Sequence, residues 1–229
     1  MFIGHYAVAL AAKRYAPEKS LGWSFIAVQF LDVLWAPFIL LGIERARVVP
    51  GFLPASSLDL YYMPWTHSLL MAFAWSWVFY RVTKSRVLGV CVFSHWVLDL
   101  VAHAPDLSLM KGPPYLGLGL WRSRPGTFWT EAIMLVIGTA IYFGCTKPKN
   151  ALGRYGMPVF VLLLIVINAW NLYGPPPSNI KAVAASGEVA LWVLAAIAAW
   201  LDRARVPALV KGKTSGSYGG PVTANSTEL

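Results

Sequence analysis

Long apolar runs with few charges recur along the chain, separated by short polar or Pro- and Gly-rich segments. The runs lie at residues 21–43, 67–82, 87–103, 128–145, 156–173 and 184–201. Each approaches the roughly 17–25 residues that an α-helix needs to cross a bilayer. The pattern predicts an all-α fold, a polytopic membrane helical bundle of about six transmembrane helices. We expect a single integral membrane domain over residues 1–205.

The two ends of the chain do not fit a full span. Residues 2–15 are apolar and end in Lys13 and Arg14, and a helix of this length reaches only about 20 Å. We expect a short N-terminal half-helix, half-spanning or re-entrant, that carries His5 into the bundle. Residues 206–229 are rich in Gly, Ser, Thr and Lys, which predicts a disordered cytoplasmic tail.

Composition and charge agree with a membrane protein. Hydrophobic residues make up 57% of the chain and charged residues 13%. A formal net charge of +9 would suit nucleic acid in a soluble protein, but here most Lys and Arg fall in the loops on one side of the predicted spans. The positive-inside rule then predicts that both termini are cytoplasmic. Nucleic acid is therefore not an expected partner.

Ionisable residues within the apolar runs gather in the first half of the chain. His95, Asp99 and His103 follow one another at intervals of four, so they share one face of the predicted helix. Burying them in hydrocarbon is costly unless they meet a partner, and a divalent cation can satisfy several at once. The full set comprises His5, His67, His95 and His103 with Asp32, Asp99 and Glu131. It predicts a metal site within residues 1–135, with the helices of 156–201 as scaffold.

Spacing limits how these residues can share an ion. His95 and His103 lie about 12 Å apart along a straight helix, so they do not easily bind one ion. His95 and Asp99 can, and Asp99 can bridge to a second ion reached by His103. One ion with three protein ligands and a water, or two ions, would each suit hydrolysis. Pro64 and Thr66 predict a helix start that places His67 in the first turn.

Several candidates keep two interpretations. His103 is either a ligand or a solvated helix-end residue, and Glu131 is a ligand, a general base or a carboxylate that interacts with the helix dipole. Arg122 and Arg124, in the loop beside the metal-binding face, suit phosphate recognition, and they suit anchoring at the lipid head groups equally well. We expect them to contact the substrate if that substrate is a phosphoester.

Three short motifs resemble the signatures of a known family. Gly4-His5 followed by Lys13, then Thr66-His67-Ser68-Leu69-Leu70, and then Ser94-His95-Trp96-Val97-Leu98-Asp99 are similar to the GH, THSL and SHxxLD signatures of the YdjM-like membrane-bound metal-dependent hydrolases of bacteria. The similarity covers residues 3–135. The order of the motifs is also similar to that of zinc-dependent phospholipase C and the P1-type nucleases, helical enzymes with a multinuclear zinc site.

These resemblances imply a ligand set. By position they imply that His5, Asp32, His67, His95, Asp99, His103 and Glu131 are metal ligands, with Asp32 as the base that acts on the attacking water. One turn before Glu131 the chain has Thr127, where the soluble enzymes would have a further histidine. We therefore expect one or two divalent ions rather than three, most simply zinc, with manganese as the alternative.

The preferred interpretation is a metal-dependent hydrolase of the bacterial inner membrane. It would cleave a phosphoester in a membrane lipid or lipid-linked substrate, in the manner of phospholipase C, with Asp32 or Glu131 managing the proton. One alternative is a transporter of metal ions or protons that uses the same intramembrane His and Asp residues. Another is a noncatalytic membrane protein with a structural metal, whose coordination shell would be closed.

Overall fold

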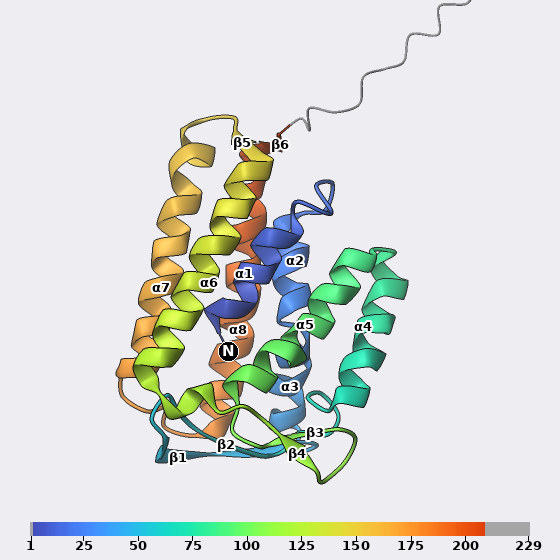
Figure 1. The fold of residues 1–229 in the computed structure, drawn as a ribbon, viewed down its shortest axis with the longest axis vertical. Coiled ribbons are helices and arrows are strands. Elements are labelled where there is room, and N and C mark those ends of the chain that lie inside the picture. Colours follow the sequence, from blue (N-terminus) through green and yellow to red (C-terminus); the bar gives the residue numbers. More distant parts are fainter. Residues whose placement is uncertain (1, 209–229) are drawn as a thin grey trace, which may run out of the picture.

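The chain folds mostly as α-helices. The computed structural model describes residues 2–208, and its helices are α1 (Ile3–Ala12), α2 (Leu21–Val28), α3 (Phe30–Leu40), α4 (Leu69–Thr83), α5 (Arg86–Ala102), α6 (Arg124–Cys145), α7 (Met157–Tyr173) and α8 (Ile180–Arg203). A 3-10 turn, η1 (Leu120–Arg122), precedes α6, and a π-helical turn, η2 (Leu152–Gly156), leads into α7. The helical bundle is confirmed (Figure 1).

Three small antiparallel sheets join the helices, so the all-α prediction is incomplete. The strands are β1 (Arg45–Leu53) with β2 (Ser56–Tyr62), β3 (Leu107–Ser108) with β4 (Tyr115–Leu116), and β5 (Thr146–Pro148) with β6 (Arg205–Pro207). Strands β1 to β4 lie at one end of the bundle, which we name the hairpin end, and β5 and β6 lie at the other, the tail end (Figure 1). The first residues of the predicted tail thus form β6, and residues 209–229 of that prediction lie outside the described part of the chain.

The structure does not support six transmembrane helices. By length and composition, the helices that can cross a membrane within residues 2–208 are α6, η2 with α7, and α8, and the bent pair α2 and α3 makes a fourth if it is one span. Helix α4 has 15 residues and α5 has 17, which gives lengths of about 23 and 26 Å, short of the roughly 30 Å of hydrocarbon. The apolar runs were located correctly, but those at 67–82 and 87–103 form helices shorter than the hydrocarbon thickness, and neither is among the candidate spans.

Capping side chains explain where many helices begin. Ser20, Ser68, Ser85, Ser123 and Asn179 are the N-cap residues of α2, α4, α5, α6 and α8, and each side chain accepts a hydrogen bond from a backbone amide of the first turn. The prediction that His67 lies in the first turn of its helix is therefore wrong. Ser68 is the cap of α4, so His67 precedes the helix on a non-helical segment.

The predicted first span is bent by 55° where α2 meets α3. Gln29, at the joint, has φ −111° and ψ 11°, which lies outside the helical region. Its side chain is buried. The bend separates the two halves of an apolar run that the hydropathy pattern had presented as one helix.

Helix α1 is buried in the bundle, as predicted for a half-helix. Ile3, His5 and Leu10 are fully buried. Gly138 on α6 permits a close approach, since a Cβ there would lie 2.3 Å from the carbonyl oxygen of Ala7. The missing side chain therefore lets α1 pack directly against α6.

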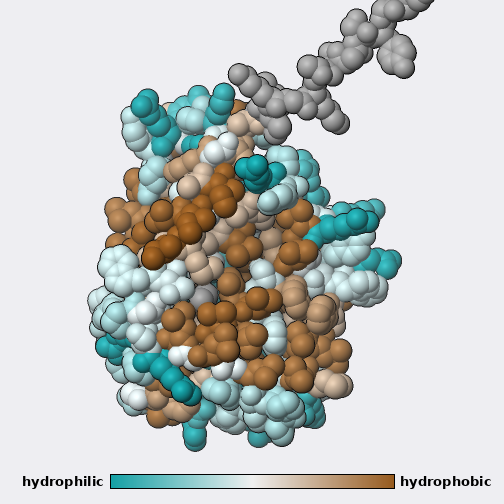
Figure 2. All heavy atoms as spheres, viewed as in Figure 1, coloured by the Kyte–Doolittle hydropathy of each residue, from teal (hydrophilic) through white to brown (hydrophobic). Residues whose placement is uncertain are grey.

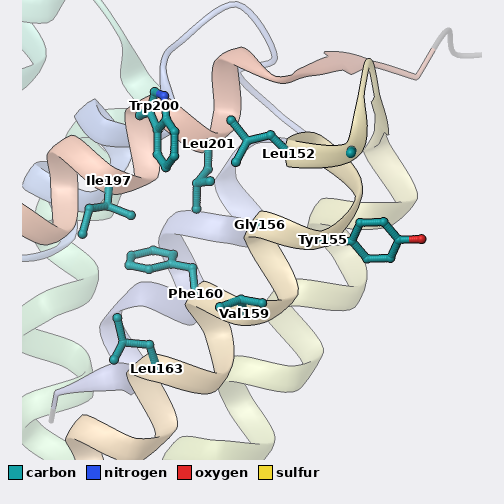
Figure 3. A pocket seen from close by; sticks show the side chains of 10 residues that line it. Leu152, Tyr155, Gly156, Val159, Phe160, Leu163, Ile197, Trp200 and Leu201 are labelled. Carbon is teal, nitrogen blue, oxygen red and sulfur yellow. The ribbon is translucent and has the colours of Figure 1, made fainter.

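The outer surface is suited to lipid. Figure 2 shows hydrophobic residues across the middle of the visible face, with polar residues gathered toward its edges. Large apolar side chains such as Leu162, Val166 and Trp200 are more than half exposed. A groove of about 530 Å³ lies between η2, α7 and α8. Figure 3 shows the apolar side chains that line it, such as Phe160, Leu163 and Trp200. Such a surface fits a membrane protein.

Candidate metal centre

The four histidines and two aspartates, Asp32 and Asp99, come from different elements and meet in the bundle. His5 lies on α1, Asp32 in the first turn of α3, and His67 just before α4. His95 and Asp99 lie on α5, and His103 is its C-cap residue. The four histidines and Asp99 are at most 4% exposed. Residues that are far apart in the sequence therefore form one buried cluster, which we call the His/Asp cluster.

One half of the cluster surrounds Oδ2 of Asp99. This oxygen lies 3.0 Å from Nε2 of His95 and 3.7 Å from Nε2 of His67. Oδ1 of Asp32 lies 3.4 Å from Nε2 of His67 and 3.8 Å from Nε2 of His95. The two imidazole nitrogens are themselves 3.3 Å apart. Ligand atoms of Asp32, His67 and His95 thus lie close enough together to hold one metal ion.

The other half surrounds Oδ1 of Asp99. Nε2 of His5 lies 3.2 Å from this oxygen, and Nε2 of His103 lies 3.6 Å from it. His5 also stacks on His95, with ring centroids 4.0 Å apart, and His5, His95 and Asp99 form a second group that can hold a metal. The two oxygens of Asp99 therefore face different sets of histidines, as expected for a carboxylate that can bridge two ions.

The backbone of α2 sets the tautomer of His95. Its Nδ1 lies 2.7 Å from the carbonyl oxygen of Val28. A carbonyl oxygen only accepts hydrogen bonds, so Nδ1 carries the proton and, in the neutral ring, Nε2 carries the lone pair. That lone pair is directed at the cluster.

Two residues outside the cluster set the tautomer of His67. The hydroxyl of Thr66 donates to Oε2 of Glu44 at 2.6 Å, and Nδ1 of His67 lies 2.7 Å from the same hydroxyl oxygen. Because the hydroxyl has only one proton, its oxygen accepts from Nδ1 of His67. Glu44 is held in turn by the backbone amides of Trp65 and Thr66. His67 therefore also presents the lone pair of Nε2 to the cluster.

His103 has the same kind of support. Its Nδ1 lies 2.9 Å from Oδ1 of Asp106, and the backbone amide of Gly119 donates to its carbonyl oxygen at 2.7 Å. His103 is 4% exposed, so it is not the solvated helix-end residue of the alternative interpretation. Asp106 orients this imidazole, as second-layer carboxylates do in metal sites.

Glu131 occupies a different position. Its Oε2 accepts hydrogen bonds from the backbone amides of Phe2, at 2.9 Å, and Gly4, at 3.2 Å. These are among the amides at the start of a helix that have no partner within the helix. Glu131 thus holds the beginning of α1, and it is not among the groups whose ligand atoms converge. This geometry favours a positioning role over the predicted ligand role.

The two predicted phosphate-binding arginines are exposed near the hairpin end. Arg124 lines the cavity described next, where its Nε donates to the carbonyl oxygen of Pro54 at 2.6 Å and its guanidinium stacks over Tyr173. Arg122, in η1, is not among the residues that line this cavity. Of the two arginines, only Arg124 lines the cavity that the His/Asp cluster also lines.

A cavity of about 980 Å³ adjoins the cluster. Asp32, His67, Asp99 and His103 line one side, and residues of α7 and α8 line another. The side chain of Asp32 is 35% exposed, so this carboxylate is the accessible member of the cluster. The prediction that 156–201 is only scaffold is therefore incomplete, because α7 and α8 form part of the cavity wall.

The donor set fits a divalent cation. Because Nδ1 of His67 and Nδ1 of His95 each donate a hydrogen bond outside the cluster, Nε2 of each ring remains to bind a metal ion, and both Nε2 atoms lie beside carboxylate oxygens. Nδ1 of His5, a fully buried residue, lacks a hydrogen-bond partner among residues 2–208, and Nε2 faces only Oδ1 of Asp99, at 3.2 Å. Buried His and Asp groups with this arrangement can hold a metal ion, and imidazole with carboxylate suits zinc or manganese.

Sequence reasoning missed the residues that orient the histidines. Glu44 lies at the end of an apolar run and Thr66 next to His67, but their contact spans 22 positions. The sequence did show that Glu44 is an acid next to apolar residues. Its burial, at 1% exposed, became evident only from the structure. The carbonyl of Val28 carries no indication in the sequence.

The chain was compared with protein-family models, with curated proteins and with solved structures, and none of them matches.

Proposed function

We propose that this protein is a membrane-embedded, metal-dependent hydrolase that cleaves a phosphoester of a lipid or lipid-linked substrate. One observation carries the proposal: Nε2 of His67 and Nε2 of His95 lie 3.3 Å from each other and beside the carboxylates of Asp32 and Asp99, in contact with a large cavity. A cation resolves this arrangement, and the cavity gives a substrate access to it.

The residues divide into two groups of ligands. Asp32, His67, His95 and Oδ2 of Asp99 would hold one ion, while Oδ1 of Asp99 with His5 and His103 offers a place for a second. We propose zinc, with manganese as the alternative. A divalent ion bound here would supply Lewis-acid chemistry, polarising a phosphoryl oxygen and lowering the pKa of a water.

Asp32 is the residue best suited to manage the proton. Its carboxylate lies within the cluster and is the one exposed to the cavity, so it can accept a proton from an attacking water. Asp99 is 2% exposed and faces histidines on both oxygens. It is therefore better suited to binding a metal ion than to transferring a proton. Glu131 instead fixes the start of α1 and thereby the place of His5.

The surroundings support a lipid substrate. Three to four helices are apolar enough to cross a membrane, and the cavity is lined in part by helices that expose large apolar side chains outward. Arg124, at the cavity, provides a cation for a phosphate. We propose that the protein lies in the bacterial inner membrane with the tail end on the cytoplasmic side, because Lys13, Lys149 and Arg203 gather there. The start of α1 lies within the bundle, next to Glu131.

Metal content tests the proposal most directly. The protein purified in detergent would be analysed by elemental mass spectrometry alongside the His95→Ala and Asp99→Ala variants. Asp59→Ala is the matched control, since Asp59 pairs with Arg47 on the β1–β2 hairpin. We expect one or two zinc or manganese ions in the wild type and the control, and loss in both cluster variants. A wild type that holds no metal after reconstitution would overturn the proposal and favour a proton relay.

A second measurement concerns the reaction. Release of phosphorylated or dephosphorylated head group from phospholipid vesicles would be followed with and without chelator. We expect turnover that depends on metal and is lost in His95→Ala, because His95 contributes to both groups of ligand atoms. Metal binding without turnover on any phosphoester would instead support a structural metal.

A further inference from the structure

The cavity also has polar groups on α7 and α8 that do not belong to the His/Asp cluster. Asn168 of α7 and Glu188 of α8 both line the cavity. Asn168 is 1% exposed, and its Nδ2 has no hydrogen-bond partner within the described residues. Burying an amide without a hydrogen-bond partner costs free energy. A ligand that accepts a hydrogen bond from Asn168 would remove this cost.

Glu188 supplies the complementary group. Its Oε1 accepts a hydrogen bond from the indole of Trp192 at 2.6 Å. Its Oε2 is enclosed and has no partner in residues 2–208. Trp35 also lines the cavity, and its indole Nε1 is likewise buried without a hydrogen-bond partner in residues 2–208. The cavity wall thus holds two unused donors and one unused acceptor.

The chemistry of these atoms distinguishes possible ligands. A hydroxyl group both accepts and donates, so it can accept from Asn168 or Trp35 and donate to Glu188. An ammonium group only donates, so it would satisfy Glu188 and leave the amide of Asn168 unpaired. An anionic carboxylate or a second phosphate would be repelled by Glu188. Hydroxyl groups therefore match this set of partners best.

We propose that Asn168, Glu188 and Trp35 form a subsite for a hydroxylated head group, such as the glycerol or sugar of a phospholipid or lipid-linked substrate. The inference rests on the proposed function, since it takes the substrate to be a phosphoester that reaches the His/Asp cluster through the same cavity. A cavity of about 980 Å³ is at the upper end of the roughly 300–1,000 Å³ of ligand pockets. It therefore has room for a phosphate at the cluster and a head group at α7 and α8.

Two short-chain lipids test the subsite. Dihexanoylphosphatidylglycerol and dihexanoylphosphatidylethanolamine share their chains and phosphate and differ in carrying hydroxyl groups or an ammonium group. Binding of each to the full-length protein in detergent would be measured by calorimetric titration, in the wild type and in His95→Ala. Phosphorus NMR would verify that the lipid stays intact.

We expect the glycerol lipid to bind about tenfold more tightly than the ethanolamine lipid in both proteins, because a buried polar group left unpaired costs a factor of that order. Asn168→Leu is expected to bring the ratio close to one. Glu188→Gln, which retains an oxygen for Trp192 but removes the charge, is expected to weaken binding of the ethanolamine lipid more than binding of the glycerol lipid, and so to raise the ratio several-fold. Glu18→Gln, at an exposed position, serves as the control and should leave the ratio unchanged.

Equal binding of the two lipids, tighter binding of the ethanolamine lipid, binding of neither, or an unchanged ratio in Glu188→Gln would overturn the inference. Because Glu188 is only partly buried, its variant keeps the test informative if Asn168→Leu does not fold. The two proposals fail separately. A protein without metal or turnover that still prefers the glycerol lipid keeps the subsite and loses the hydrolase, and an active enzyme without that preference does the opposite.

Discussion

Two buried polar clusters in this protein are built on opposite principles. At the tail end, the carboxylate of Asp202 accepts hydrogen bonds from Nζ of Lys13 at 2.6 Å, the amide of Leu21 at 3.1 Å and the hydroxyl of Tyr142 at 2.9 Å. Nζ of Lys13 also donates to the carbonyl oxygen of Lys19. Each contact of this cluster joins a donor to an acceptor, so the group links the end of α1 to α2, α6 and α8 without a further component.

The His/Asp cluster instead brings metal-binding atoms together. Nδ1 of His95 and Nδ1 of His67 already donate to the carbonyl oxygen of Val28 and the hydroxyl of Thr66, and the two Nε2 atoms lie close to each other and to aspartate oxygens. A bound cation would therefore stabilise this arrangement. The comparison teaches that burial of polar groups serves two ends here: one cluster joins helices, and the other is held ready for a cation by the helices it lies between.

The largest expected effect on stability is at the Asp202 cluster of the tail end. Asp202→Ala leaves the buried Lys13 without its counter-charge, and breaking such a pair costs about 3–5 kcal/mol of the free energy of unfolding. Thermal unfolding in detergent, followed by circular dichroism, would measure it against Glu18→Ala at an exposed site. Asp202→Ala with an unchanged midpoint would show that the pair does not join the helices.

Metal removal should affect only the other cluster. An ion present at about 100 times its Kd stabilises the folded state by about 2.7 kcal/mol, so a chelator should lower the unfolding midpoint of the wild type. Asp99→Ala should show no such response, and Asp202→Ala should show it in full. A chelator response that disappears in Asp202→Ala would mean that the two clusters depend on each other.

The residues that orient His67 should tune metal affinity. Thr66→Val removes the hydroxyl between His67 and Glu44, and loss of such a supporting contact lowers metal affinity by about 10–100-fold. Competition with a zinc indicator would measure the change. Thr139→Val is the matched control, because Thr139 is also buried and its hydroxyl donates to a backbone carbonyl. Thr66→Ser should restore affinity, and failure to do so would point to packing instead.

The smallest expected effect is at Glu131. Glu131→Ala removes the acceptor for the first amides of α1, which is worth about 1 kcal/mol by analogy with helix caps. Metal content should stay as in the wild type, and the unfolding midpoint should fall slightly. If elemental mass spectrometry found one ion fewer, Glu131 would be a ligand, as the sequence had suggested.

Much of the cluster could be predicted because helix periodicity determines it locally. The spacing of His95, Asp99 and His103 places three groups on one face of any helix, and His5 on a helix too short to span must lie within the bundle. Asp32 and His67 were found as ionisable residues in apolar runs. These inferences require only the period of a helix and the cost of burying charge.

The rest depends on contacts that no local pattern contains. Glu44 reaches Thr66 through the path of the β1–β2 hairpin, and hydropathy does not indicate that this segment pairs as strands. The number of spans was overestimated because an apolar run says little about where Ser68 or Ser85 begins a helix. The role of α7 and α8 in the cavity wall was missed because Asn168 and Glu188 gain meaning only when the helices face the cluster.

The bend between α2 and α3 also has a meaning for protein design. Val28 ends α2, so its carbonyl is among those that the helix itself does not need, and it is this carbonyl that accepts from His95. A designer who idealised the span, replacing Gln29 to obtain one straight and more stable helix, would give this oxygen an amide partner within the helix. The straightened helix would compete for the carbonyl oxygen that orients His95. A design based on this fold should therefore keep the bend.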